Sequence, residues 1–392
     1  MRFARAVARV PDVRLLGVVH TPPGGADAGL FHDLVRVTEP LSARDILEGV
    51  EVLKRRHGQP YRIVGILEAL MVQLGQARAH FGVPGTRPEV AELFRDKARM
   101  KDALRAAGLP VAKSALIRSR ADAEAFAAEA GFPMVVKPPA GMGSKSTHRV
   151  ESLDDLLRVA TAMGAGPGNP VLAEEFLRGR EDSYETLVTG GEVRVESCSR
   201  YLPGCLEAVE NPWIQWCCLL PRDLSDPVFD RCRTAGRAAI AALGLDNGMT
   251  HMEWFLTPKG EAIFGEVACR PGGAHLTDQM NYSHDIDLFR EWARVAVHQR
   301  FEATAPRKYN TGIVFKRAQG RGRITRIEGL GAWLRDAGHW CVEERLLRPG
   351  THRRDWKQTL LSDGHLMVRH PDWDEAYRLS FAAATGIKMY AE

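Results

Sequence analysis

Apolar and polar positions along the chain follow two different periods, and this pattern predicts helices and strands in turn. Apolar residues at helical spacing fill 96–108, which begins at an aspartate and ends at a glycine, and 226–244, which begins at Asp-Pro and also ends at a glycine. Short apolar runs predict strands at 13–19, 134–137 and 171–177. Helices and strands that alternate along the chain are typical of an α/β protein.

A β-hairpin is predicted around the turn at 257–260, and it brings two carboxylates together. Pairing of the two residues that flank this turn places Glu253 opposite Phe264, so that Glu266 lies diagonally across on the same face. Two carboxylates on one face are suitable ligands for Mg²⁺, which is often bound together with nucleotide phosphates, and Arg270 adds a cation nearby. The alternative is a half-solvated sheet whose exposed face simply carries charges.

A glycine-rich loop follows the strand that ends at Lys137. Glycines allow backbone N–H groups to approach an anion closely, and lysines add charge-assisted contacts. The spacing of a Walker phosphate loop is absent, so an ordinary surface hairpin stays an alternative. The residues predicted to bind phosphate here are Lys137, Gly141, Gly143, Ser144, Lys145, Ser146 and Thr147.

A second group of candidate nucleotide contacts surrounds the turn at Gly179. Carboxylates there can accept hydrogen bonds from an adenine amino group or from ribose, and apolar neighbours can pack against a base, although salt bridges to nearby arginines would explain the same carboxylates. These candidates are Glu174, Glu175, Phe176, Leu177 and Glu181. Lys97, in the first turn of the helix that begins at Asp96, is a further candidate, with simple solvation as the alternative.

Taken in chain order, these segments resemble the ATP-grasp superfamily from roughly Pro88 to Gly273. The resemblance implies a two-subdomain ATP-grasp fold, which is α+β, between a doubly wound N-terminal α/β domain and a small C-terminal α/β domain. The expected domains are 1–88, 89–305 and 306–392, with the subdomain boundary at residues 170 and 171. Similar families begin with a strand before the first helix, and none precedes Phe3, so we expect that the first strand is missing.

The resemblance also implies roles for the site residues. Lys97 would lie near adenine or the inner phosphate, Lys137 would meet the inner phosphates, and the loop from Gly141 to Thr147 would cover the outer ones. Glu174 would accept the adenine amino group, the backbone near Phe176 and Leu177 would contact the base edge, and Glu181 would bind ribose.

By the same resemblance, Glu253 and Glu266 would bind Mg²⁺, or Mn²⁺, and Arg270 would bind an acyl phosphate. One position departs from the family. An asparagine commonly stands two residues after the second glutamate, and this chain has Ala268, which cannot bind a metal. Water, His251 or another group would take that place, or a second metal ion would bind more weakly.

The implied function is an ADP-forming ligase, in which ATP phosphorylates a small carboxylate and an amine then displaces phosphate to form a C–N bond. Amino-acid or peptide ligases and carbamoyl-phosphate-synthase-like proteins share this pattern. Two alternatives stay open: a bicarbonate-using carboxylase of the biotin-carboxylase type, and an ATP-binding regulator without turnover. His275, Asp278 and Tyr282 follow the glycine turn and are candidates to face the substrate, with helix capping and packing as the alternative.

Composition agrees with a cytoplasmic enzyme of two or three domains. The 392 residues are 45% hydrophobic and 26% charged, with a net charge of +4, and no basic stripe with interleaved aromatics indicates nucleic-acid binding. The seven cysteines include no C-x-x-C pair, so free thiols in a reducing compartment are expected. No apolar run approaches 18 residues, which argues against a membrane span, and arginines interrupt the N-terminal apolar stretch, which argues against a signal peptide. The partners expected are the small-molecule substrates and, in a homodimer, a second copy of the chain.

Overall fold

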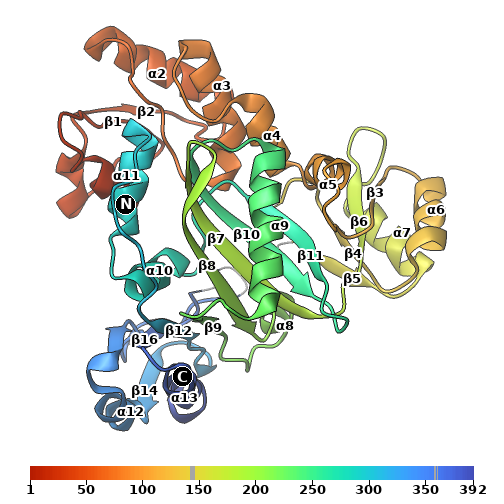
Figure 1. The fold of residues 1–392 in the computed structure, drawn as a ribbon, viewed down its shortest axis with the longest axis vertical. Coiled ribbons are helices and arrows are strands. Elements are labelled where there is room, and N and C mark those ends of the chain that lie inside the picture. The colour runs from red at the N-terminus through yellow and green to blue at the C-terminus, as the bar shows by residue number, and fades with distance from the viewer. Residues whose placement is uncertain (142–145, 357–358, 360) are drawn as a thin grey trace.

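The largest element of the protein, in this computed structural model, is an antiparallel sheet of eight strands (Figure 1). The structure describes residues 1–141, 146–356, 359 and 361–392. The strand order is β11-β10-β7-β8-β9-β12-β16-β15. The bounds are β7 Arg180–Thr189, β8 Glu192–Leu202, β9 Cys217–Leu220, β10 Gly248–Leu256, β11 Ala262–Ala268, β12 Asn310–Phe315, β15 Cys341–Glu344 and β16 His365–His370.

Helices cover both faces of this sheet. Helix α9 (Pro227–Leu243) packs on β7, β10 and β11, and it starts and stops where the sequence predicts: the Asp226 side chain accepts a hydrogen bond from the backbone N–H of Val228, and Gly244 ends the helix in the left-handed region. The opposite face is covered by α10 (Leu276–His284) and α11 (Leu288–His298), against which α1 (Arg2–Val7) packs.

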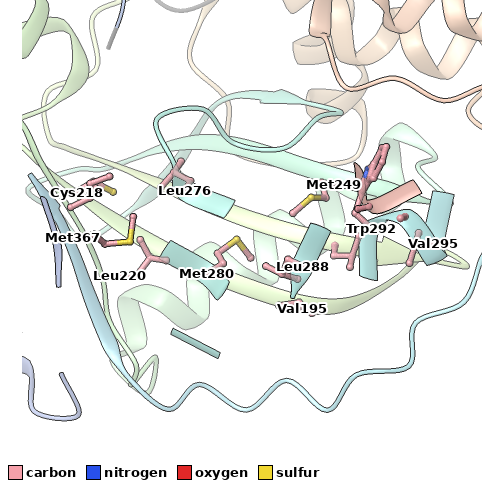
Figure 2. Packing of buried hydrophobic residues seen from close by; sticks show 14 of the residues in the cluster. Val195, Cys218, Leu220, Met249, Leu276, Met280, Leu288, Trp292, Val295 and Met367 are labelled. Atoms are coloured by element: carbon pink, nitrogen blue, oxygen red, sulfur yellow. The ribbon is translucent and has the colours of Figure 1, made fainter. Parts of the chain in front are cut away.

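The core under α10 and α11 joins distant segments of the chain. Figure 2 shows Met280 of α10 and Trp292 of α11 beside Met249 of β10 and Leu220 of β9, all of them buried. Burial of such side chains contributes about 1.5–3 kcal/mol each relative to exposure. This core therefore holds both the sheet and the turn that precedes α10 in place.

A smaller antiparallel sheet, with the order β3-β6-β4-β5, lies beside the large one (Figure 1). Its elements are β3 Ser114–Ile117, α6 Arg120–Ala130, β4 Met134–Lys137, β5 His148–Val150, α7 Leu153–Ala162 and β6 Val171–Glu175. The strand predicted at 134–137 is confirmed, but the one predicted to end at Leu177 ends at Glu175. A side chain at Gly179 would lie 2.2 Å from the carbonyl oxygen of Leu256, so the chain turns there in direct contact with β10.

The N-terminal region contains a parallel pair, β1 (Leu16–Val19) and β2 (Asp33–Arg36), with α2 (Ala43–His57) packed on it. Helices α3 (Met71–Phe81), α4 (Pro88–Arg95) and α5 (Lys97–Ala106) then lead to the small sheet. The two 3-10 segments of this region are Gly25–Leu30 and Glu68–Leu70.

The C-terminal region continues the large sheet and adds a second, three-stranded sheet. Strands β12, β16 and β15 lie beyond residue 305 and belong to the eight-stranded sheet. The remaining elements are β13 Gln319–Gly320, β14 Ile324–Glu328, α12 Leu330–Ala337, the 3-10 turn Gly338–Trp340, α13 Trp373–Gly386 and β17 Lys388–Ala391. The division of the chain at residues 88, 170 and 305 stays a prediction.

Candidate active site

A cavity of about 750 Å³ lies between the small and the large sheet. Its wall is formed by β4 and the loop after it, the β6–β7 connection, α8 (Cys205–Glu210), β10 and β11. Most of the residues predicted from the sequence meet here. Those that line the cavity are Lys97, Lys137, Gly141, Thr147, Glu174, Glu175, Phe176, Leu177, Glu181, Glu253, Glu266 and Arg270.

One buried carboxylate joins two lysines at the end of the cavity near the small sheet. Glu174 Oε2 lies 3.0 Å from Lys137 Nζ, and Glu174 Oε1 lies 3.2 Å from Lys101 Nζ. Burial lowers the pKa of Lys101, whereas the carboxylates of Glu174 and Glu266 outweigh burial and raise the pKa of Lys137. The two lysines likewise hold the pKa of Glu174 below its usual value in spite of burial. Both oxygens of Glu174 are thus engaged by lysines.

Lys101 was missed by the sequence analysis. It lies one helical turn after Lys97 on α5, and that i, i+4 spacing was the available signal. Its side chain is fully buried, while Lys97 is 6% exposed and places Nζ 3.2 Å from Glu266 Oε2. Together with Lys137, these side chains form a cluster of three lysines on one side of the cavity.

The two predicted metal-binding glutamates lie directly opposite each other, not diagonally as the sequence predicted. Leu256 pairs with Ala262, and a bulge at Gly265 then brings Glu253 opposite Glu266. Two shifts of one residue each explain the error: Leu256 pairs with Ala262 and not with Glu261, and the bulge, which counting from the turn cannot reveal, adds the second shift. A Cβ at Gly265 would lie 2.9 Å from the carbonyl oxygen of Glu253, so this close approach favours glycine.

A histidine stands across the ladder from Ala268, the position where the family pattern has asparagine. His251 pairs with Ala268, and its Nδ1 lies 2.9 and 3.0 Å from the carboxylate oxygens of Glu185, while Nε2 lies 3.6 Å from Glu253 Oε1. Burial would lower the pKa of His251, but Glu185 raises it to about 10. Burial would raise the pKa of Glu253, but His251 lowers it. Glu185 was missed because it comes close only through strand pairing.

Arg270 is oriented by a buried carboxylate from the N-terminal region. Its Nε lies 2.9 Å from Oε2 of Glu68, and Glu68 Oε1 lies 3.3 Å from Arg95. Arg95 also donates to the carbonyl oxygen of Gly141, at 2.9 Å, where the glycine-rich loop begins. Glu68 carried no sequence signal, because it lies about 200 residues before Arg270.

The β6–β7 connection supplies the other wall. Glu175 Oε1 accepts a hydrogen bond from the backbone N–H of Lys113 at 2.8 Å, and the Phe176 ring lies under the Arg149 guanidinium. Glu181 Oε2 accepts a hydrogen bond from the backbone N–H of Cys205, at 2.8 Å. Burial, followed by the charge of Glu253, raises the pKa of Glu181 to about 8.

The glycine-rich loop is described only in part. Gly141 and Thr147 line the cavity, and Ser146 is exposed with a φ of 59°. The predicted phosphate contacts Gly143, Ser144 and Lys145 lie outside the described residues.

His275 turns toward the C-terminal strands, and Asp278 bonds to His275 and to Arg2 of α1. The wall of the cavity includes Gly273, Ala274 and Leu276, but the His275 ring packs on His365 with 4.2 Å between ring centroids. The contact of His275 and Asp278 with substrate stays a prediction.

The donor set suits a hard divalent cation. Glu253 and Glu266 face one cavity, and their side chains are 26% and 28% exposed, so an ion can reach both. Mg²⁺ and Mn²⁺ favour oxygen ligands of this kind, together with phosphate oxygens.

Comparison with known proteins agrees with this geometry. Residues 96–193 match the model of the carbamoyl-phosphate synthase L chain, ATP binding domain. The L-arginine-specific L-amino acid ligase of Bacillus subtilis is 26% identical over 316 residues, which are 79% of this chain and 76% of that protein. The carbamoyl phosphate synthase large chain of Paenarthrobacter aurescens is 31% identical over 225 residues, 56% of this chain, but this match spans only 20% of that protein.

Solved structures share the fold over nearly the whole chain. The L-amino acid ligase from Bacillus licheniformis has a TM-score of 0.78 at 18% identity, and the match covers 98% of this chain and 100% of that one. A second match is the biotin carboxylase domain dimer of Hydrogenobacter thermophilus 2-oxoglutarate carboxylase, solved with MgADP and bicarbonate. It has a TM-score of 0.70 at 18% identity, and the match covers 99% of this chain and 89% of that one.

The two-sheet arrangement, the cavity and these matches agree with the resemblance to the ATP-grasp superfamily that the sequence motifs indicate. Among its relatives are ligases that form C–N bonds. No helix in the described ranges has the length and apolar character needed to cross a membrane.

Proposed function

We propose that this protein is an ATP-dependent ligase that activates a small carboxylate as an acyl phosphate and joins it to an amine. The observation that carries the proposal is the meeting of three lysines, two opposed glutamates and Arg270 around one cavity. Such a site concentrates positive charge where phosphoryl groups carry negative charge.

The proposed reaction has two steps. A carboxylate oxygen of the first substrate attacks the γ-phosphorus of ATP, and the bond from that phosphorus to the β,γ-bridging oxygen breaks, which releases ADP. The amine nitrogen then attacks the acyl carbon, the bond to the phosphate oxygen breaks, and inorganic phosphate leaves as the amine loses a proton. The described part of the cavity wall contains no serine, and burial raises the pKa of the Cys205 thiol well above its usual value, which disfavours the nucleophilic thiolate, so the nucleophile is the amine of the second substrate.

Each residue has a proposed part in these steps. Lys97 and Lys137 bind phosphate oxygens, and Arg270 binds the acyl phosphate, where its planar fork matches two oxygens. Glu253 and Glu266 would hold Mg²⁺, or Mn²⁺, which supplies charge neutralisation for the phosphates. For Glu174 we propose that it positions the lysines, because both its oxygens already face them.

The proposed substrates are amino acids or short peptides. Similarity to an L-amino acid ligase over 79% of the chain supports this class, whereas the carbamoyl phosphate synthase match leaves most of that larger protein without a counterpart. A bicarbonate-using carboxylase is the second candidate, favoured by the shared fold of a biotin carboxylase domain, and a non-catalytic ATP-binding regulator is the third.

A substrate matrix tests the proposal. Purified protein is incubated with Mg²⁺–ATP and pairs of amino acids, with bicarbonate in a separate arm, and ADP formation and product mass are measured. We expect ADP and a condensed product in equal amounts for at least one pair, and neither with Glu266→Gln. ADP formation only with bicarbonate would support the carboxylase, and nucleotide binding without turnover in every arm would support the regulator. Sedimentation of the same sample tests the predicted homodimer.

A further inference from the structure

A second group of polar side chains meets between α10 and the C-terminal strands. It consists of His275 in the turn that enters α10, Glu343 on β15 and His365 on β16. One ligand atom from each lies within 4.8 Å of the other two. Glu343 and His365 are diagonal neighbours on one face of the sheet, because Glu343 pairs with Met367 and the backbone N–H of Arg345 donates to His365.

Hydrogen bonds fix the orientation of all three side chains. His275 Nδ1 lies 2.8 Å from Asp278 Oδ2, which leaves Nε2 as the other ring nitrogen available to a ligand. His365 Nε2 lies 2.9 Å from Glu343 Oε2, and the Tyr282 hydroxyl donates to Glu343 Oε1 at 3.3 Å. A carboxylate on the far nitrogen of an imidazole is the usual second-layer partner of a metal-binding histidine.

These groups are largely shielded from water. The side chains of His275, Glu343 and His365 are 20%, 16% and 5% exposed, and that of Asp278 is 8% exposed. Two imidazoles and one carboxylate are a ligand set for Zn²⁺ and similar transition-metal ions, whereas Mg²⁺ favours oxygen ligands alone.

We propose that His275, Glu343 and His365 form a binding site for one transition-metal dication, of which Zn²⁺ is the probe to use. Asp278 contacts His275 and Tyr282 contacts Glu343, so these two residues orient the ligands without binding the ion. Water completes the coordination. For His275 and Asp278 this assignment is an alternative to the substrate contact that the sequence predicted.

A metal here connects the C-terminal strands to the cavity wall. Gly273, Ala274 and Leu276 line the cavity on either side of His275, so an ion that holds His275 also holds this wall. The site does not depend on the proposed ligase function, because its ligands share no atom with the opposed glutamates.

The test is a metal titration of the full chain after chelator treatment. Co²⁺ serves as a spectroscopic probe and Zn²⁺ competes with it, with Mg²⁺ in excess to fill sites made only of oxygen ligands. We expect one Zn²⁺ per chain with a Kd of about 10 μM or tighter, and visible Co²⁺ bands without a thiolate charge-transfer band. The absence of a thiolate band distinguishes this site from one that includes Cys205 or Cys341, of which Cys341 lies two residues before Glu343.

Variants link the ion to its ligands. His365→Ala and Glu343→Gln should each weaken Zn²⁺ binding by more than about 100-fold, and Asp278→Asn by about 10- to 100-fold. His20→Ala, which changes an exposed histidine, should leave it unchanged. Circular dichroism checks that each variant is folded, and because two ligand variants are used, one misfolded protein does not decide the result. No saturable binding to the wild-type chain below about 1 mM, or a Kd that neither ligand variant changes, would overturn the proposal.

Discussion

Replacement of Glu174 by glutamine should destabilise the protein strongly, because it leaves two buried lysines without their shared carboxylate. Lys101 is fully buried, the Lys137 side chain is 14% exposed, and Glu174 lies 3.2 and 3.0 Å from them. Removal of one partner from a buried ion pair costs about 3–5 kcal/mol, since the remaining charge stays buried and unpaired. Lys137 keeps a second carboxylate, Glu266, at 3.8 Å, so we expect Lys101 to account for most of the loss.

The assay is urea unfolding of the wild type, Glu174→Gln, Lys101→Met and the double variant. If the pair interacts as the structure indicates, the double variant should recover at least half of the stability lost in Glu174→Gln, because a neutral pair buries no unpaired charge. A loss below about 1 kcal/mol in Glu174→Gln, or a double variant whose loss is the sum of the single losses, would refute the reasoning.

Nucleotide binding separates the two roles considered for Glu174. If the carboxylate positions lysines for phosphate, Glu174→Gln should weaken ATP binding by about tenfold or more and leave adenosine binding unchanged. If Glu174 instead accepts the adenine amino group, the affinities for ATP and for adenosine should fall by a similar factor. Calorimetry with ATP and adenosine measures both values on the same protein.

Three further predictions follow from the cavity. Arg270→Lys should lower kcat/KM for the carboxylate by about 100-fold while ATP affinity changes less than about threefold, because lysine lacks the fork that meets two oxygens, and a main defect in ATP binding would contradict this. Glu181→Gln should remove a pH dependence of stability, because the pKa of Glu181 in the folded protein, about 8, exceeds its usual value of 4.5. The wild type should therefore lose stability relative to the variant as pH rises between these two values, which urea unfolding across that window measures. His251→Asn should move the acidic limb of the pH–rate profile to higher pH, because His251 holds the pKa of Glu253 down, and an unmoved limb would show that Glu253 does not depend on it.

Helix and strand ends could be predicted from the sequence because they depend on local signals. The helix cap at Asp226, the stop at Gly244 and the strand ending at Lys137 depend on residues a few positions apart, and each lies where predicted. The spaced lysines, glutamates and glycines also carried the resemblance to the ATP-grasp superfamily, because residues that bind phosphate and metal need particular chemical types in a particular order.

The contacts that tune those residues were decided only by the tertiary structure. A turn one residue longer than predicted and a bulge at Gly265, both invisible in the pattern of residues, set Glu253 opposite Glu266. Glu68 meets Arg270 and Glu185 meets His251 across long stretches of chain, and Lys101 of α5 meets Glu174 of β6. Charge, burial and pKa depend on what lies within a few ångströms, and the order of residues along the chain does not specify those neighbours until the sheets have formed.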